Sequence, residues 1–134
     1  KLRLNVWISA KGIQDDKFKF PYKAKTSDGI KEFKDMSDVD DELVRTAYES
    51  EQQGFNIGEA VWYEHFYFCN TSDLIDRDSQ TLIKAYQYCS ESNTPPYPSL
   101  DMTPSNFIDS WMIIRNELTH IRNIDMKERQ NAHK

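Results

Sequence analysis

The segment RNELTH, residues 115–120, contains side chains suited to cleaving a phosphate ester. A histidine can take up and return a proton near neutral pH, and an arginine can hold a phosphate through paired N–H donors. Five residues separate Arg115 from His120, so on a helix they differ by about 140° around the axis. We expect both to flank an apolar helix face, with Asn116 and Glu117 pointing away. In a two-fold pair of such helices, two arginines and two histidines could meet in one groove; the alternative is a solvated helix flank.

The pattern Arg115-Asn116-x-x-x-His120 resembles the RNxxxH signature of HEPN ribonuclease domains. In that family the motif lies on a late helix of a helical bundle, and two copies meet in a dimer that cleaves RNA without a metal ion. The resemblance implies that Arg115 and His120 are the catalytic pair and that Asn116 is a supporting polar residue. It covers six residues of the 134 in the chain.

Four further side chains are of the types that bind zinc, namely His65, Cys69, Cys89 and His120. Their spacing fits no standard zinc motif, and isolated cysteines are more often small buried hydrophobic residues. The sequence also contains no glycine-rich phosphate loop, nucleophile elbow, HExxH or EF-hand loop. We therefore expect no metal ion and no cofactor, and the common nucleotide-dependent enzymes are disfavoured.

An acidic segment, residues 35–53, carries seven Asp/Glu and a single Arg. A helix with such a face can dock on a basic surface, although most acidic helix faces are only solvated. The predicted interface consists of acids from the first helical turns and two tryptophan anchors, namely Asp38, Asp40, Asp41, Glu42, Trp7 and Trp111. The leading hypothesis is a protein that binds another protein, as an inhibitor or accessory factor. The alternatives are the dimeric ribonuclease, which would bind RNA, and a structural or assembly component.

Charge is unevenly distributed along a chain whose net charge is −5. Residues 1–34 carry nine Lys/Arg and four Asp/Glu, and residues 115–134 carry five bases and three acids, whereas the middle is acidic. Acidity there argues against broad binding of a nucleic-acid backbone by the middle of the chain. The basic N-terminal segment could contact nucleic acid or an acidic protein, although lysines that protect a sheet edge are the simpler interpretation.

The cysteine count and the hydropathy of the chain indicate the cellular compartment to expect. Two cysteines do not make a disulfide framework, so we expect a reducing compartment, the cytoplasm. No apolar run has membrane-spanning length, and the chain does not open with a signal-peptide pattern, so we expect no membrane partner.

Alternating apolar residues predict two strands within residues 2–25. Leu2, Leu4, Val6 and Ile8 alternate with more polar positions, and KFKFPYKAK, residues 17–25, alternates again. Aromatic and β-branched residues predict a third, central strand at 60–69. Its rings could stack on nucleic-acid bases, but no Lys or Arg lies among them, which favours core packing.

Helical spacing predicts three helices. The first covers residues 37–53 with Ser37 as its cap, and the second runs from Ser72 or Asp78 to Ser92. The third covers residues 104–127 after a Thr103-Pro104 start signal. Its apolar seam has heptad-like spacing and could self-associate, with Phe107, Trp111, Ile114, Leu118 and Ile121 as members.

These elements predict a single α+β domain spanning residues 1–134, with a small antiparallel sheet of about three strands packed with about three helices. The parts are a basic β-rich region at 1–34, the acidic helix at 35–53, the aromatic strand at 60–69 and the long C-terminal helix at 104–127. Because the predicted strands depart from an all-helical bundle, the predicted fold and the HEPN resemblance point in different directions.

Overall fold

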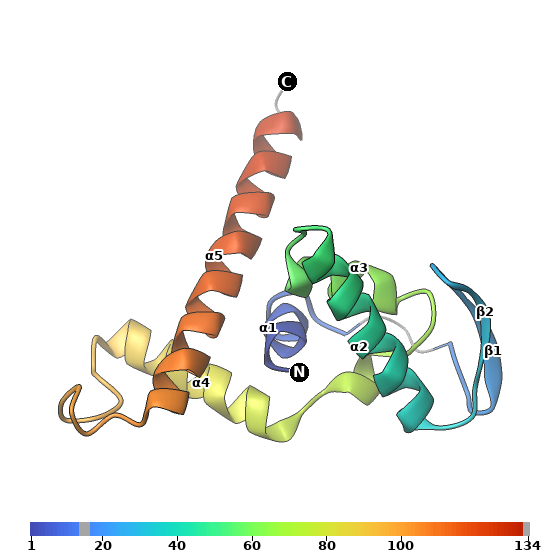
Figure 1. The fold of residues 1–134 in the computed structure, drawn as a ribbon. Coiled ribbons are helices and arrows are strands. Elements are labelled where there is room, and N and C mark those ends of the chain that lie inside the picture. Colours follow the sequence, from blue (N-terminus) through green and yellow to red (C-terminus); the bar gives the residue numbers. More distant parts are fainter. Residues whose placement is uncertain (14–16, 133–134) are drawn as a thin grey trace. The chain divides into compact units, whose positions relative to one another are not determined.

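The structure, a computed structural model, describes residues 1–13 and 17–132 (Figure 1). Within them lie five α-helices, one 3-10 helix and one antiparallel pair of strands. The fold class is α+β as predicted, but the sheet has two strands rather than about three. In chain order the elements are α1 (Leu2–Lys11), β1 (Tyr22–Thr26), β2 (Gly29–Phe33), α2 (Met36–Gln52), α3 (Ile57–His65), η1 (Thr71–Leu74), α4 (Arg77–Ser92) and α5 (Ser105–Ala132).

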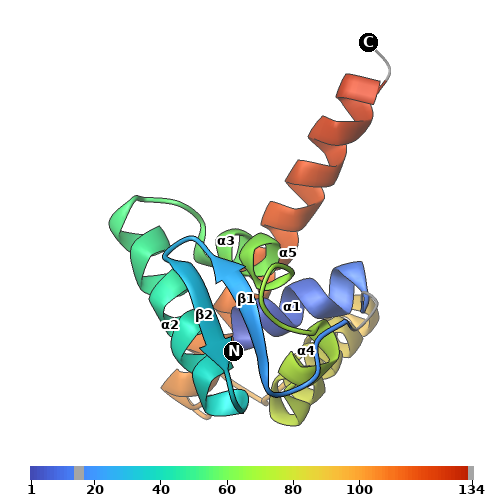
Figure 2. The ribbon, with the colours of Figure 1, turned by 90° about the vertical axis from the view of Figure 1, so that its right-hand side faces the viewer.

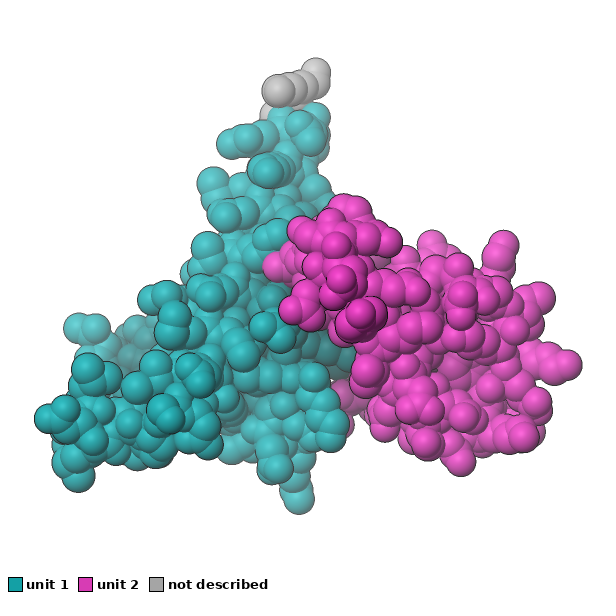
Figure 3. All heavy atoms as spheres, in the orientation of Figure 1, with its two compact units in different colours: residues 1–11, 76–134 teal, residues 12–75 magenta. Residues whose placement is uncertain are grey.

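The chain forms two compact units (Figure 3). Unit 1 combines Lys1–Lys11 with Asp76–Lys134 and contains α1, α4 and α5. Unit 2 is Gly12–Ile75 and contains the β-hairpin, α2, α3 and η1. The RNELTH segment therefore belongs to an all-helical unit, and both strands belong to the other.

Helix α1 shows that the first predicted strand was wrong. Leu4, Trp7 and Ile8 have the helical spacing i, i+3, i+4, and every residue from Leu4 to Ile8 is buried. α1 packs against both α4 and α5. Because α1 has neighbours on two sides, its apolar residues are not confined to one helical stripe. The apolar residues at positions 4, 6 and 8 therefore give the same alternating pattern as a strand.

A buried asparagine joins α1 to the start of α4. The Asn5 Oδ1 atom accepts hydrogen bonds from the Asp76 backbone N–H at 2.9 Å and from Gln80 Nε2 at 3.0 Å. The Asp76 carboxylate in turn accepts from the Ser79 N–H at 3.0 Å and caps α4. The predicted second helix is thus confirmed, with its start at Arg77 and its end at Ser92.

The long C-terminal helix is also confirmed, and α5 extends to Ala132, beyond the predicted end at 127. Ile114 and Ile121 of the apolar seam are buried, and α5 packs against α1 and α4. Trp111 stacks on Phe107 with ring centroids 4.7 Å apart and meets Tyr86 of α4 edge-on at 5.1 Å. Ile114 and Ile121 of the seam therefore pack inside unit 1, whereas Phe107, Trp111 and Leu118 are half-buried.

The strands of unit 2 form an antiparallel hairpin that lies beside α2 (Figure 2). Tyr22 pairs with Phe33, and Lys25 pairs with Ile30. β1 begins directly after Pro21, so only the second half of the predicted strand at 17–25 is a strand. β2 was not predicted; Gly29, with φ of +104°, permits the tight return between the two strands.

Helix α3 replaces the predicted aromatic strand at 60–69, which was wrong. The Asn56 side chain accepts a hydrogen bond from the Glu59 N–H at 2.8 Å and caps the helix. Its buried residues are Gly58, Val61, Trp62 and His65, spaced as one helix face. The helix at 37–53 is confirmed as α2, but Asp35 rather than Ser37 is its cap.

Candidate functional site

The RNELTH residues lie near the middle of α5 and differ in exposure. Arg115 and Asn116 are exposed, His120 is half-buried, and Glu117 is only 5% exposed. The expectation that Glu117 points away from the packed face was therefore wrong. Arg115, Asn116 and His120 remain accessible around a carboxylate that faces the interior of unit 1.

Glu117 attaches α5 to α1 through two residues of α1. Its Oε2 atom accepts a hydrogen bond from Trp7 Nε1 at 2.9 Å, and its Oε1 atom lies 3.7 Å from Arg3 Nε. Arg3 and Trp7 are four positions apart, so they share one face of α1. Burying a carboxylate without partners costs several kcal/mol, and these two donors offset that cost.

His120 lies beside the same tryptophan. The ring centroids of Trp7 and His120 are 6.3 Å apart, with an angle of 63° between the ring planes. Trp7 thus contacts two members of the segment, Glu117 through its N–H and His120 through the ring. Sequence reasoning missed this supporting role of Arg3 and Trp7. The helical spacing of Leu4, Trp7 and Ile8 was the available signal for placing Trp7 in a core.

Trp7 and Trp111 were both predicted to be interface anchors. Trp7 has no exposed surface, so that assignment was wrong for it. Trp111 is half-buried and packs between Phe107 and Tyr86. Its ring fills the contact between α4 and α5, and only its remaining surface is open to a partner.

The four predicted acids of α2 do not form one surface. Asp40 and Asp41 are exposed, whereas half-buried Asp38 accepts a hydrogen bond from the Lys34 backbone N–H at 2.8 Å. Glu42 is only 3% exposed, so its assignment as an interface residue was wrong. Asp38 and Glu42 therefore have roles inside unit 2, and two of the four acids face solvent.

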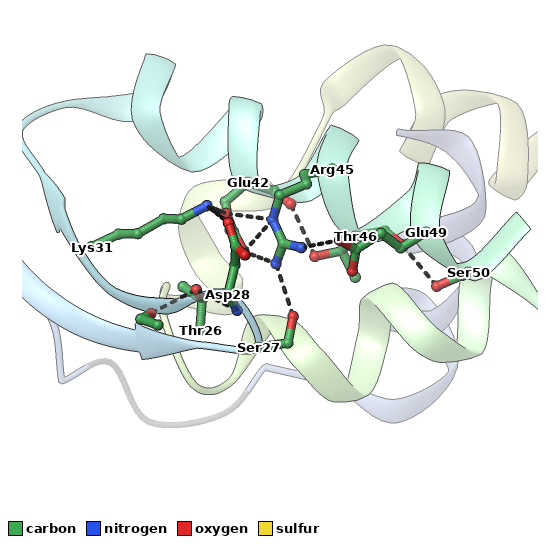
Figure 4. A network of polar contacts seen from close by, with 10 residues as sticks. Thr26, Ser27, Asp28, Lys31, Glu42, Arg45, Thr46, Glu49 and Ser50 are labelled. Atoms are coloured by element: carbon green, nitrogen blue, oxygen red, sulfur yellow. Dashed lines mark hydrogen bonds and ion pairs between the residues drawn. The ribbon is translucent and has the colours of Figure 1, made fainter. Parts of the chain in front are cut away.

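Glu42 is the centre of a charged network (Figure 4). Lys31 Nζ of β2 donates to it at 2.8 Å, and the Arg45 guanidinium donates to both carboxylate oxygens. Arg45 also donates to Glu49 at 2.6 Å and to the Ser27 hydroxyl at 2.8 Å. Burial by itself raises the pKa of Glu42, but the hydrogen bonds from Arg45 and Lys31 outweigh it and hold that pKa below its usual value.

His65 and Cys69 have structural surroundings in unit 2. The His65 ring is fully buried; its Nδ1–H donates to the Trp62 carbonyl, and its Nε2 lies 2.8 Å from the Thr71 hydroxyl. Burial lowers the pKa of His65 and raises that of the Cys69 thiol. Cys69 Sγ donates to the His65 carbonyl at 3.4 Å. Across the described ranges 1–13 and 17–132, no three His, Cys, Asp or Glu side chains are grouped as metal ligands would be.

Comparisons with known proteins identify no relative of this chain. The chain matches no protein-family model, no curated protein and no solved structure. Within the described part of the chain, no helix has the length and apolar character needed to cross a membrane.

Proposed function

We propose that this protein is a metal-independent ribonuclease of the HEPN type that acts as a dimer. The observation that carries the proposal is that Arg115 is exposed and His120 half-exposed on α5, a helix that Glu117 attaches to α1. The resemblance of residues 115–120 to the RNxxxH signature supplies the reaction class. The helical composition of unit 1 supports it, because the first predicted strand is helix α1 and the two strands that do form lie in unit 2.

In this reaction the 2′-hydroxyl of a ribose attacks the adjacent phosphorus while the bond to the 5′-oxygen of the next nucleotide breaks. His120 takes the proton from the attacking hydroxyl, and a protonated His120 of the second copy gives one to the leaving oxygen. Arg115 contacts the non-bridging oxygens, where negative charge develops in the transition state. The products are a 2′,3′-cyclic phosphate and a 5′-hydroxyl, so no metal ion and no water are consumed in this step.

Two copies are required because Arg115 and His120 differ by about 140° around a single helix. The outward face of α5 carries exposed apolar residues on both sides of the motif, Met112 at 47% and Met126 at 55% exposure. They are fourteen residues apart, two heptads, and so share that face. If the outward α5 faces of two copies pack together, Arg115 of one copy comes close to His120 of the other.

The test is cleavage of single-stranded RNA by the purified chain in the presence of a chelator. His120→Ala and Arg115→Ala should each lower the rate by about 100-fold or more, the range of general acid–base contributions. Arg122→Ala is the matched control for Arg115, because Arg122 is exposed on α5 seven residues later. Thr119→Ala is the control for His120. Cleavage that persists in His120→Ala would identify a contaminating nuclease and overturn the proposal.

Dimer formation needs its own measurement. Met112→Glu should shift the chain toward monomer in sedimentation velocity and lower the cleavage rate in parallel, because it introduces a charge into an apolar contact. Wild-type protein that is monomeric at the concentrations where it cleaves RNA would contradict the dimeric mechanism.

Protein binding is a second candidate, supported by the outward face of α2. Val44 and Tyr48 are 68% and 61% exposed at helical spacing i, i+4, next to exposed Asp40 and Asp41. An apolar pair flanked by acids suits a basic partner protein. Asp40→Lys with Asp41→Lys should abolish capture of that partner, whereas Asp101→Lys with Asp109→Lys, the same charge change at exposed sites of unit 1, should not. Equal capture by both variants would remove α2 from the interface.

A further inference from the structure

A run of lysines and aromatic rings leads into and along β1. The nine residues KFKFPYKAK, 17–25, contain four lysines and no acid. Lys17, Lys19, Lys23 and Lys25 are all exposed. In the described part of the chain, no carboxylate lies within ion-pair distance of these four ammonium groups. Unlike Lys31, which is bound to Glu42, they are available to an external anion.

The backbone of this run is held in place although its first part is not a strand. The Asn70 side chain accepts from the N–H groups of Lys17 and Phe18 at 3.1 Å each and donates to the Phe18 carbonyl at 2.8 Å. The Tyr22 hydroxyl donates to the Phe68 carbonyl at 2.7 Å. Asn70 therefore holds the backbone at Lys17 and Phe18, and pairing with β2 holds it from Tyr22 onward. This lowers the entropy lost when the lysines bind a ligand.

Aromatic rings accompany the lysines. Tyr22 stacks on Phe18 at 4.8 Å and on Phe33 at 5.3 Å, so these rings continue into the core of unit 2. The Phe20 ring contacts Tyr22 at 5.2 Å but is still 38% exposed. A partly exposed ring supported from behind by another ring can stack on a nucleic-acid base.

We propose that residues 17–25 bind single-stranded RNA, with the four lysines contacting phosphates and the Phe20 ring stacking on a base. Interleaved cations and rings are the combination with which proteins hold single strands, because the cations follow the backbone and any base offers a face for stacking. Only the choice of RNA over DNA rests on the proposed ribonuclease function. The rest of unit 2 carries more acids than bases, so within that unit this run is the segment suited to phosphates.

The neighbouring strand contributes one opposing charge. Glu32 of β2 lies opposite Lys23 in the hairpin register and is exposed. Its carboxylate repels a phosphate bound at Lys23, so Glu32→Gln should strengthen binding. A gain of affinity from a single neutral substitution cannot be produced by misfolding.

The test measures binding of a fluorescent oligouridylate of roughly 12 nucleotides, within known site sizes, by anisotropy. The full chain carries His120→Ala so that the RNA stays intact. Replacing Lys17, Lys19, Lys23 and Lys25 with Gln should weaken binding at least tenfold. A plot of the logarithm of the binding constant against the logarithm of salt concentration should have a slope of about −3 for the parent protein, the value for four phosphate contacts on a single strand. The quadruple variant should give a shallower slope. Phe20→Leu keeps apolar bulk but loses the stacking face, and should weaken binding roughly fivefold or more.

The matched control changes four exposed positive residues of unit 1 to Gln, namely Arg77, Lys84, Lys127 and Arg129. It alters net charge equally and should bind much as the parent protein does. Equal losses in the two quadruple variants would overturn the proposal, because they would indicate general attraction rather than a site. Equal affinity for duplex RNA would also overturn it, since bases in a duplex are unavailable for stacking.

The outcome is separable from that of the ribonuclease proposal. Cleavage with unchanged RNA affinity in the lysine variant would retain the ribonuclease and reject this site. Lysine-dependent binding by a wild-type chain that does not cleave RNA would retain the site and reject the ribonuclease. Tighter binding of oligodeoxyuridylate than of oligouridylate would reject RNA as the ligand.

Discussion

The indole N–H of Trp7 donates a hydrogen bond to the Glu117 carboxylate over 2.9 Å, between residues 110 positions apart in the chain. Both side chains are buried, so the bond connects the first and last helices of unit 1 away from solvent. The Trp7 ring also contacts His120, so the packing of α1 against α5 bears directly on the proposed catalytic residue.

Trp7→Phe should lower the free energy of unfolding by about 1.5–3 kcal/mol, the usual range for a hydrogen bond to a charged group. The variant keeps an aromatic ring but leaves the buried Glu117 carboxylate without its closest donor. Urea denaturation followed by circular dichroism measures the change. Trp111→Phe is the control, because half-buried Trp111 takes part in ring contacts with Phe107 and Tyr86. Equal losses in both variants would show that ring volume, and not the hydrogen bond, is responsible.

Glu42→Gln should destabilise unit 2 by about 1–3 kcal/mol at neutral pH, because Lys31 and Arg45 lose a charged acceptor. Hydrogen bonds in the folded state lower the pKa of Glu42, so its stabilising contribution is complete above the ordinary pKa of 4.5. The contribution is lost as pH falls below that value through the folded-state pKa. Urea titrations at a series of pH values should therefore show the wild type approaching the variant in acid. A difference in the free energy of unfolding between wild type and variant that stays constant with pH would contradict this account.

His65 should make unit 2 sensitive to mild acid. Its pKa is lowered by burial, so its stabilising effect is complete above the ordinary pKa of 6.5 and declines as pH falls from there toward the folded-state pKa. Only the unfolded chain takes up the proton readily in that range. His65→Gln should remove the pH dependence of stability between pH 6.5 and the folded-state pKa of His65. The measurement is the change of the urea midpoint with pH. A pH dependence that persists unchanged in His65→Gln would contradict this assignment.

The two cysteines should differ in reactivity toward iodoacetamide. Cys69 is buried, and burial raises the pKa of its thiol, so little reactive thiolate forms. Cys89 is half-buried on α4. Mass spectrometry of samples quenched at intervals should find Cys89 alkylated first in the native protein and both cysteines alkylated at similar rates in urea. Faster native labelling of Cys69 would mean that unit 2 opens readily.

The amino-acid sequence by itself determined the helices α2, α4 and α5, because each has apolar residues at helical spacing and a recognisable start, such as Pro104 before α5. It also placed Arg115, Asn116 and His120 on one helix. The same reasoning failed for α1 and α3, whose residues are apolar or aromatic at most positions. Periodicity distinguishes a helix from a strand only when one side is polar. α1 is buried at every position from Leu4 to Ile8, and the open side of α3 carries the aromatic Tyr63, which is 46% exposed.

Tertiary structure decided which polar residues of the candidate sites are accessible. Glu42 and Glu117 look like any other surface acids in the sequence, yet both are buried because cations or donors from other elements meet them. The partners of Glu42 come from β2 and its own helix, and those of Glu117 come from α1. A carboxylate is buried only where donors compensate for the lost water. Local i, i+3 spacing supplies Arg45 to Glu42, whereas packing between elements supplies Lys31 to Glu42 and both Arg3 and Trp7 to Glu117.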